Sequence, residues 1–227
     1  DHRAGYVNII GRPNVGKSTL LNALLGDDLV IVNPKAQTTR HRILGILNEA
    51  DFQLILSDTP GILEPAYKLQ ESMMHAVDAA LGDADVLLVM VELGEVPEKS
   101  GELLRRARRF TGATLVLINK VDQGDEVRLN EAFELWQAAF PGAPILPISA
   151  LHGLHIKELR SKLVNMLPVH PPYFPKDELS DRDLRFFISE IIREKVLGLY
   201  KQEIPYSTQV VVNSFEESPE LVKVQAD

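Results

Sequence analysis

Short apolar runs alternate with amphipathic stretches along most of the chain. The apolar runs predict strands over residues 6–10, 42–47, 52–56, 86–91, 114–118 and 145–148. Hydrophobic residues at helical spacing predict helices over residues 17–25, 69–81, 98–110, 126–140 and 156–166. Strands and helices that alternate in this way favour an α/β fold, with a mixed, mostly parallel sheet flanked by helices.

The pattern changes after Leu167, where prolines become frequent. Pro168, Pro171, Pro172 and Pro175 predict a stiff, extended linker over residues 168–180. The chain is therefore divided into a larger domain, residues 1–167, and a smaller segment, residues 181–227.

The smaller segment begins with a predicted helix. Ser180 and Asp183 have the spacing of a capping box at its start, and Pro205 would end it. An apolar stripe runs along this helix, formed by Leu184, Phe187, Ile188, Ile191, Ile192, Val196 and Leu199. Residues 208–215 are predicted as a strand and residues 221–225 as the start of another. A helix and so little sheet cannot enclose a core, so we expect this domain to be incomplete.

Composition narrows the function classes. Hydrophobic residues make up 45% of the chain and charged residues 25%, as in an ordinary globular protein. The net charge of −8 gives no electrostatic argument for a nucleic-acid partner. The absence of cysteine excludes disulfides and thiolate metal sites. No apolar run approaches the roughly 20 residues that span a bilayer, and no signal-peptide pattern is present, so we expect a cytoplasmic protein.

Two groups of side chains on the predicted helices receive structural interpretations. Arg105, Arg106, Arg108 and Arg109 form a basic cluster that we expect on a solvated face. Trp136 and Phe140, one helical turn apart, are expected in the core between helix and sheet.

A glycine-rich segment follows the first predicted strand. Residues 11–18 read Gly-Arg-Pro-Asn-Val-Gly-Lys-Ser and match the phosphate-binding loop G-x-x-x-x-G-K-[ST]. Backbone amides of such a loop cradle phosphates, and the dipole of the following helix adds to the attraction. The residues assigned to this nucleotide site are Asn14, Val15, Gly16, Lys17, Ser18 and Thr19. Lys17 would reach the β- and γ-phosphates, and the Ser18 hydroxyl would bind Mg²⁺.

Asp58-Thr59-Pro60-Gly61 follows another strand. Asp58 can hold Mg²⁺ through water, and the Gly61 amide can contact a γ-phosphate. Alone, these four residues would suit an ordinary turn at the end of a strand. Their position after a phosphate loop favours the functional interpretation.

Two further motifs suit a guanine base. In Asn119-Lys120-Val121-Asp122, the aspartate can accept from N1–H and from the exocyclic amine of guanine, a match that adenine cannot make. Asn119 would brace this pocket, and the Lys120 stem can lie over the base. In Ser149-Ala150-Leu151, the Ala150 amide can donate to guanine O6. All these motifs follow predicted strands, and ligands of open α/β sheets bind at the carboxyl ends of the strands.

The motifs, in this order, resemble the G1, G3, G4 and G5 signatures of the GTPase superfamily. Residues 37–42, Gln-Thr-Thr-Arg-His-Arg, resemble switch I of the Era family of GTPases. After the linker, residues 193–195, 199–200 and 203–207 resemble the opening of the KH-type RNA-binding domain of that family. One departure is that no G-x-x-G, the loop that clamps RNA in KH domains, occurs after Pro168.

This resemblance implies a Mg²⁺-dependent GTPase that binds GTP and GDP. It also implies binding of small-subunit ribosomal RNA and a role in assembly of the 30S subunit. A monomer is expected, in the cytoplasm and with peripheral contact to the inner membrane, although no basic amphipathic helix supports that contact.

The resemblance also implies roles at the catalytic centre. A switch I threonine would bind Mg²⁺ and the γ-phosphate, and Thr39 is preferred to Thr38 because it directly precedes Arg40. The predicted catalytic residues are then Lys17, Thr39 and Gly61, and the predicted metal ligands are Ser18, Thr39 and Asp58. Ile62 stands where signalling GTPases carry a glutamine that orients the attacking water, so slow intrinsic turnover is expected.

Resemblance to potassium-dependent GTPases of the same branch suggests that the Asn14 side chain binds K⁺ beside the phosphates. The alternative is that Asn14 only stabilises the loop through a local hydrogen bond.

Two other interpretations stay open. One is a nucleotide-gated binding module, in which docking is the output and hydrolysis is incidental. The other is a different GTPase of the same branch, although the chain lacks the cysteine, second phosphate loop or membrane spans of its other members. An ATPase is disfavoured, because Asp122 would face the acceptor N1 of adenine.

Overall fold

The structure, a computed structural model, describes residues 1–32, 38–200, 208–218 and 221–227. Gln37 of the switch I resemblance, Pro205 and the rest of segment 203–207 of the KH-type resemblance lie outside the described residues.

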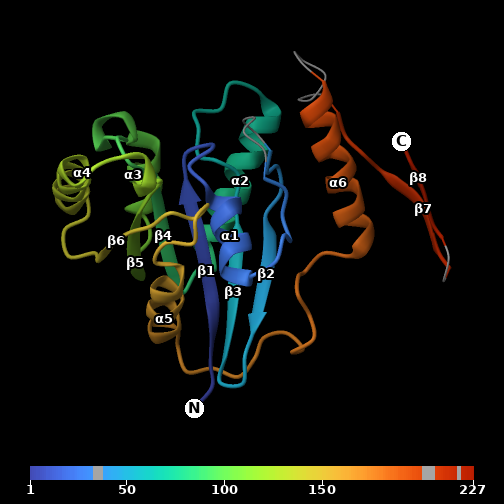
Figure 1. Ribbon diagram of the computed structural model, residues 1–227, viewed down its shortest axis with the longest axis horizontal. Helices are drawn as coiled ribbons and strands as arrows, with labels where there is room; N and C mark the ends of the chain where they lie inside the picture. The colour runs from blue at the N-terminus through green and yellow to red at the C-terminus, as the bar shows by residue number, and fades with distance from the viewer. Residues whose placement is uncertain (33–37, 201–207, 219–220) are drawn as a thin grey trace.

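A mixed sheet forms the centre of the larger domain (Figure 1). Its described strands are β1 (Arg3–Gly11), β2 (Ile43–Asn48), β3 (Phe52–Asp58), β4 (Val86–Glu92), β5 (Ala113–Asn119) and β6 (Ile145–Pro147). Their spatial order is β2-β3-β1-β4-β5-β6; β2 is antiparallel to β3 and the other neighbours are parallel. The predicted mixed, mostly parallel sheet is confirmed.

Helices cover both faces of this sheet. They are α1 (Lys17–Leu25), α2 (Lys68–Gly82), α3 (Gly101–Ala107), α4 (Glu126–Ala139) and α5 (Ile156–Met166), with 3₁₀ turns η1 (Pro97–Lys99) and η2 (Val121–Gln123). The prediction of one helix over residues 98–110 is wrong, because the helical conformation is interrupted at Ser100, between η1 and α3. There the Ser100 hydroxyl donates to the buried carboxylate of Glu95 at 2.7 Å, which holds the chain in a turn.

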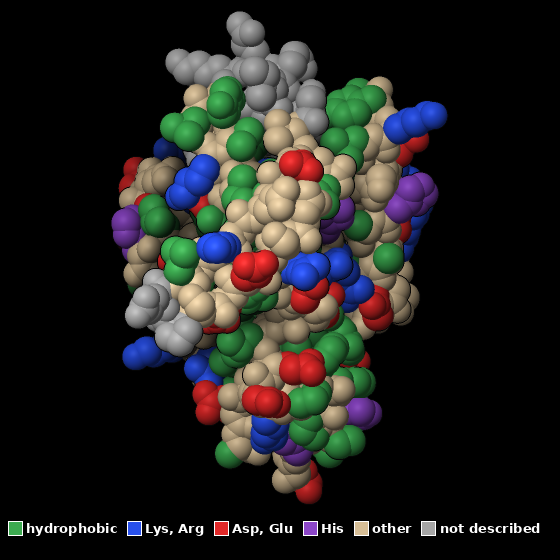
Figure 2. Space-filling view, turned by 90° about the vertical axis from the view of Figure 1, so that its right-hand side faces the viewer, with side chains coloured by type: hydrophobic (Ala, Val, Ile, Leu, Met, Phe, Trp, Pro, Cys, Tyr) green, Lys and Arg blue, Asp and Glu red, His purple; other side chains and the backbone are tan. Residues whose placement is uncertain are grey.

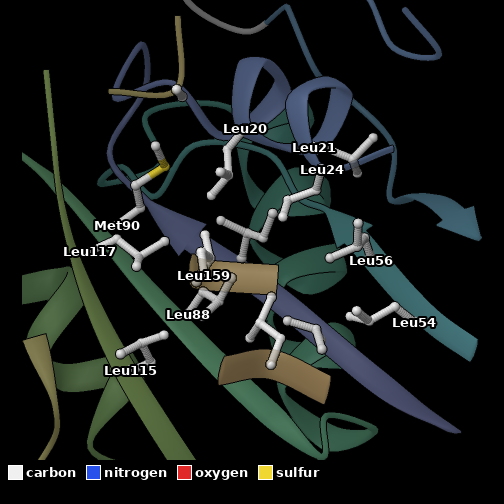
Figure 3. Packing of buried hydrophobic residues seen from close by; sticks show 14 of the residues in the cluster. Leu20, Leu21, Leu24, Leu54, Leu56, Leu88, Met90, Leu115, Leu117 and Leu159 are labelled. Carbon is white, nitrogen blue, oxygen red and sulfur yellow. The ribbon is translucent and has the colours of Figure 1, made fainter. Parts of the chain in front are cut away.

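Buried side chains alternate between the two faces along each strand, as the pleat requires. On β4, Leu88 and Met90 belong to the cluster that packs under α1 and α5 (Figure 3). Leu87 and Val89 belong to the opposite cluster, under α2, α3 and α4. Burying each such side chain stabilises the fold by roughly 1.5–3 kcal/mol. The sheet is therefore a rigid platform for the loops at its carboxyl edge.

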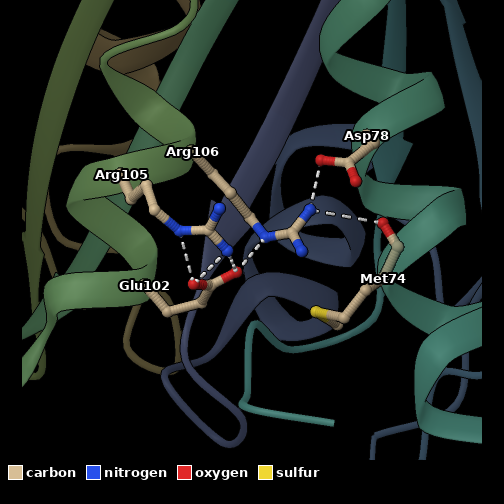
Figure 4. Close-up of polar contacts among 5 residues, drawn as sticks. All are labelled: Met74, Asp78, Glu102, Arg105 and Arg106. Carbon is tan, nitrogen blue, oxygen red and sulfur yellow. Dashed lines mark hydrogen bonds and ion pairs between the residues drawn. The ribbon is translucent and has the colours of Figure 1, made fainter.

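Two expectations about side chains on the helices have different outcomes. Trp136 is fully buried and stacks on Phe140, so their place in the core is confirmed. The prediction of a solvated face is wrong for Arg106, which is 6% exposed. Its guanidinium is ion-paired with Glu102 on α3 and Asp78 on α2 (Figure 4). Charge patterning along one helix could not show this, because Asp78 comes from a different helix.

The linker lies against the larger domain. Gln53 on β3 is fully buried, and its Oε1 accepts from the amides of Tyr173 and Phe174 at 2.7 and 3.0 Å. Further along, the Ile46 amide on β2 donates to the Leu179 carbonyl at 2.9 Å. The extended course therefore comes from pairing with the sheet as well as from proline stiffness.

The smaller segment contains α6 (Leu184–Leu199), on the β2 side of the sheet, and a hairpin of β7 (Val212–Glu217) and β8 (Val222–Ala226) on the far side of α6 (Figure 1). The capping-box prediction is wrong: Asp183 caps α6 by accepting from the Phe186 amide at 2.9 Å. The Ser180 hydroxyl instead donates to the Leu44 carbonyl on β2 at 2.6 Å.

The predicted apolar stripe of α6 is only partly covered: Phe187, Ile188, Ile192 and Val196 are half-buried, and the rest of the stripe is exposed. Leu184, Ile191 and Leu199 are 55%, 53% and 78% exposed, whereas Arg193 and Leu197 are buried. Helical periodicity identifies an apolar side of a helix but does not say which side meets a neighbour.

Figure 2 shows the side of the molecule on which α6 and the hairpin lie. Acidic and basic side chains are interspersed there among hydrophobic ones, so charge alone does not mark an RNA-binding face. Among the helices in the described ranges, none has the length and apolar character needed to cross a bilayer.

Candidate nucleotide-binding site

A cavity of about 440 Å³ opens at the carboxyl edge of the sheet. Its lining residues are Pro13, Asn14, Gly16, Lys17, Ser18, Thr19, Ile31, Val32, Thr38, Thr39, Gly61 and Lys120. Most of them belong to the predicted site. Pro13, Ile31 and Val32 do not, and the only signal of the last two in the sequence is their place at the end of the apolar run 29–32.

The loop between β1 and α1 has the backbone shape of a phosphate cradle. Asn14 and Gly16 have φ angles of 63° and 107°, in the left-handed region. A Cβ on Gly16 would lie 2.4 Å from Asn119 Nδ2, so a larger residue does not fit. Because α1 begins at Lys17, its first amides point toward the same cavity.

Lys17 lies across the mouth of this loop. Its ammonium donates to the Gly11 and Arg12 carbonyls at 3.3 and 3.0 Å. The side chain is buried, and burial lowers the pKa of the Lys17 ammonium to about 8, against the opposing effect of Asp58.

Three oxygen-bearing side chains meet beside Lys17. Asp58 Oδ2 accepts from Ser18 Oγ at 2.8 Å and from Thr39 Oγ1 at 3.2 Å, and the two hydroxyl oxygens are 3.2 Å apart. Asp58 is fully buried, and its second oxygen, Oδ1, has no hydrogen-bond partner among the described residues. Burial raises the pKa of the Asp58 carboxyl, although Lys17 opposes this.

This oxygen set fits a magnesium ion, which prefers hard oxygen ligands and usually shares them with phosphate and water. The buried Asp58 Oδ1 is the observation that favours the fit, since a carboxylate oxygen without a partner is costly in an apolar interior. Within the described residues no group of three His, Cys, Asp or Glu side chains forms a cage of its own. Of the two candidate threonines, Thr39 is the one whose hydroxyl meets Asp58 and Ser18.

The segment after Asp58 is held against the phosphate loop. Thr59 Oγ1 donates to the Ile9 carbonyl at 2.7 Å, and the Ile62 amide donates to the Gly11 carbonyl at 2.9 Å. A Cβ on Gly61 would lie 2.6 Å from Pro13, so this position requires glycine. The Ile62 side chain is buried in the core and has no group that could hold a water.

Asn119 joins the phosphate loop to the loop after β6. Its Nδ2 donates to the Val15 carbonyl at 2.8 Å, and its Oδ1 accepts from the Ala150 amide at 3.0 Å. The Ala150 amide thus makes a bond inside the protein, and its predicted bond to guanine O6 stays a prediction. The Leu151 amide makes no hydrogen bond within the described residues, and the Leu151 side chain is exposed.

Asp122 lies in η2, beside the loop after β6. A hydrogen bond from the Ser149 side chain holds the pKa of the Asp122 carboxyl below its usual value. Two residues beside this motif, His152 and Glu92, belong to no recognised motif and were not predicted from sequence. His152 Nε2 lies 3.5 Å from Asp122 Oδ2, and Glu92 forms an ion pair with Lys120. Only the folded loops bring these residues together.

Comparisons with known proteins agree with this geometry. Residues 6–120 match the family described as 50S ribosome-binding GTPase. GTPase Era of Geotalea uraniireducens (strain Rf4) is 42% identical over 226 residues, which cover 99% of this chain and 76% of that protein. The chloroplastic GTPase ERA-like of Oryza sativa subsp. japonica is also 42% identical, over 96% of this chain. The chain spans only about half the length of that plant relative, 53%.

Similarity in three dimensions extends past the nucleotide site. A crystal structure of Era in complex with MgGDPNP and nucleotides 1506–1542 of 16S ribosomal RNA matches with a TM-score of 0.93 at 36% identity. The match covers 100% of this chain and 78% of that chain, so it includes the linker, α6 and the hairpin. Motifs, geometry and similarity over the whole length lead to one conclusion: the chain belongs to the Era family of GTPases.

Proposed function

We propose that this protein is a GTP-binding and GTP-hydrolysing switch that binds small-subunit ribosomal RNA and assists assembly of the 30S subunit. The observation that carries the proposal is the meeting of Ser18, Thr39 and Asp58 oxygens beside Lys17, at the mouth of a phosphate loop. The RNA partner rests on the similarity to Era, whose structure contains a 16S ribosomal RNA segment.

Each side of the phosphate site has a distinct role. The amides of residues 14–19 and the Lys17 ammonium hold the phosphates, and the oxygens of Ser18, Thr39 and Asp58 hold Mg²⁺. When bound, Mg²⁺ neutralises negative charge on the β- and γ-phosphate oxygens. A phosphate beside Lys17 raises the pKa of that ammonium, and a cation beside Asp58 lowers the pKa of that carboxyl. The nucleotide thus favours the charged forms that burial alone disfavours.

The base is held on the other side of Asn119. Asp122 accepts from the two guanine N–H groups, while Asn119 fixes the pocket and the Lys120 stem covers the base plane. Ser149 positions the Asp122 carboxylate. Ala150 supports Asn119, and the Ala150 and Leu151 amides are the proposed donors to guanine O6.

Hydrolysis is proposed to be slow without a partner. Lys17, Thr39 and the Gly61 amide stabilise charge that develops on the γ-phosphate. Ile62 offers no hydrogen bond to the attacking water, so positioning of that water limits the rate.

The division into domains forms part of the proposal. Residues 1–167 are the GTP-binding domain, residues 168–180 the linker, and residues 181–227 the beginning of a KH-type domain that binds RNA. We propose that the protein acts as a monomer in the cytoplasm. Peripheral membrane contact is not part of this proposal, because a net charge of −8 gives no attraction to an anionic bilayer.

Adding RNA is expected to raise the rate of GTP turnover severalfold. The assay compares phosphate release with and without an RNA of the segment seen with Era, nucleotides 1506–1542 of 16S ribosomal RNA. ATP and an RNA of scrambled sequence serve as controls. GTP-dependent RNA binding with no change in turnover would favour the nucleotide-gated binding module instead.

Potassium is expected to accelerate hydrolysis severalfold over sodium at equal ionic strength. Asn14 lines the cavity, and we propose that its side-chain oxygen binds K⁺ beside the phosphates. Asn14→Gly removes that oxygen and tolerates the φ angle of 63°, so turnover of this variant should be the same in both salts. Equal rates in the wild type would contradict the potassium site. If the variant is slower by the same factor in both salts, Asn14 only stabilises the loop.

A further inference from the structure

The contact between α6 and switch I contains a buried arginine. Arg193 is 3% exposed and, with Leu197, is one of the two buried side chains of a helix whose other residues are half-buried or exposed. Its Nη2 donates to the main-chain carbonyl of Thr38 at 2.5 Å. The same guanidinium donates to the carboxylate of Glu190, one turn earlier on α6, at 2.8 and 2.5 Å.

A buried charge at this position needs a reason beyond packing. A guanidinium is costly to remove from water, and an apolar side chain of the same volume would bury more cheaply. Glu190 neutralises Arg193 from within α6, so the ion pair is complete without the GTP-binding domain. The bond from Arg193 to Thr38 is what connects this pair to the nucleotide site.

The peptide plane transmits this contact to the metal ligand. The Thr38 carbonyl and the N–Cα bond of Thr39 belong to one planar unit, so a bond that fixes the carbonyl also fixes the start of Thr39. Thr39 Oγ1 lies 3.2 Å from Asp58 Oδ2. Two more contacts join the same stretch to the smaller segment: Arg40 Nη1 donates to the Thr208 carbonyl at 2.7 Å, and the rings of His41 and Phe186 lie 6.3 Å apart.

We propose that Arg193 is a positioning residue through which α6 holds Thr39 ready for Mg²⁺ and the γ-phosphate. This inference rests on the proposed function of the site. Discrimination between GTP and GDP then depends on a residue outside the GTP-binding domain. Because coupling of binding free energies is reciprocal, a bound triphosphate also strengthens the attachment of α6 to switch I.

The test compares the affinity for GDPNP with that for GDP in Arg193→Met, both in saturating Mg²⁺. Loss of a charge-assisted hydrogen bond should weaken GDPNP binding by about tenfold. Binding of GDP, which has no γ-phosphate for Thr39 to contact, should change by less than about threefold. Arg182→Met is the matched control. Arg182 Nη2 also joins the smaller segment's side of the molecule to the larger domain, by donating to the Arg42 carbonyl at 2.9 Å, but Arg42 lies three residues after Thr39. Its ratio of GDPNP to GDP affinity should equal that of the wild type.

Equal weakening of both nucleotides, or no weakening, would overturn the proposal. If Arg193→Met does not fold, Arg193→Lys is measured in the same way. A lysine keeps a positive charge beside Glu190, but its single amine lacks the fork that reaches both partners. The same selective loss of GDPNP binding is then expected. An unchanged ratio of GDPNP to GDP affinity would overturn the role of Arg193 but not the proposed function. A wild type with no preference for guanine over adenine nucleotides would overturn the proposed function as well.

Discussion

Asp122→Asn is expected to lower the affinity for GDP and GTP by about a hundredfold, because a bidentate, charge-assisted contact is lost. The amide still accepts at one atom but presents an N–H where guanine also presents a donor. Xanthine carries a carbonyl oxygen at the position of the guanine amine, so xanthine nucleotides should bind this variant better than guanine nucleotides do. Titration of labelled GDP, XDP and ADP against the wild type and Asp122→Asn measures the change of preference from guanine to xanthine.

Asp125→Asn provides the control for this experiment. Asp125 lies three residues further on, caps α4 and accepts from the Arg128 amide at 2.9 Å. An asparagine caps a helix about as well as an aspartate, so guanine binding should be unchanged. If Asp122→Asn bound GDP as the wild type does, or lost GDP and ADP equally, the base pocket would have to be placed elsewhere.

Asp58→Asn is expected to slow Mg²⁺-dependent GTP turnover by about 100- to 1,000-fold, the loss typical of removing one stabilising group from a transition state. The substitution keeps the shape and the acceptor for Ser18 but removes the negative charge that attracts the cation. Because burial raises the pKa of the Asp58 carboxyl, the charged form is disfavoured in the folded protein. The melting temperature without nucleotide should therefore stay the same or rise while turnover falls.

The Mg²⁺ dependence of turnover separates this role from a general defect. Asp58→Asn should need a higher Mg²⁺ concentration than the wild type for half-maximal turnover. Ser18→Ala should raise that concentration as well. Asp85→Asn is the control, since Asp85 accepts from the Tyr6 amide at 2.8 Å, away from the nucleotide edge. A turnover that falls with no change in Mg²⁺ dependence would exclude Asp58 from the metal site.

The parts of the site that could be predicted from sequence are those that one short segment supplies. The phosphate loop is contiguous, and its glycines, Lys17 and Ser18 have a fixed spacing because the backbone itself binds the phosphates. Asp122 was predictable for the same reason, as part of a four-residue motif at the end of a strand. The order of strands and helices followed from short apolar runs and helical spacing, since central strands such as β4 are buried on both faces and appear as continuous apolar runs.

What could not be predicted depends on contacts between distant segments. Ser180 and Asp183 both carry a capping oxygen, and the bond from Ser180 to the Leu44 carbonyl decides which of them caps α6. Thr38 and Thr39 are equivalent by residue type, so the preference for Thr39 came from resemblance, and the contact of its hydroxyl with Asp58 is seen only in the fold. Arg193 is one of several polar residues of α6, and its partner Thr38 lies 155 residues earlier in the chain.

The pairing of the linker with β2 has a consequence for self-association. β2 is the outermost strand of the sheet, and an open outermost strand is a template for pairing with another molecule. Leu179 and Ser180 use part of that edge through the Ile46 amide and the bridge to Gly45. A polypeptide that stopped at Leu167 would leave those backbone groups open to a neighbouring molecule. The linker thus covers part of an edge at which another molecule could pair, as well as joining the larger domain to α6.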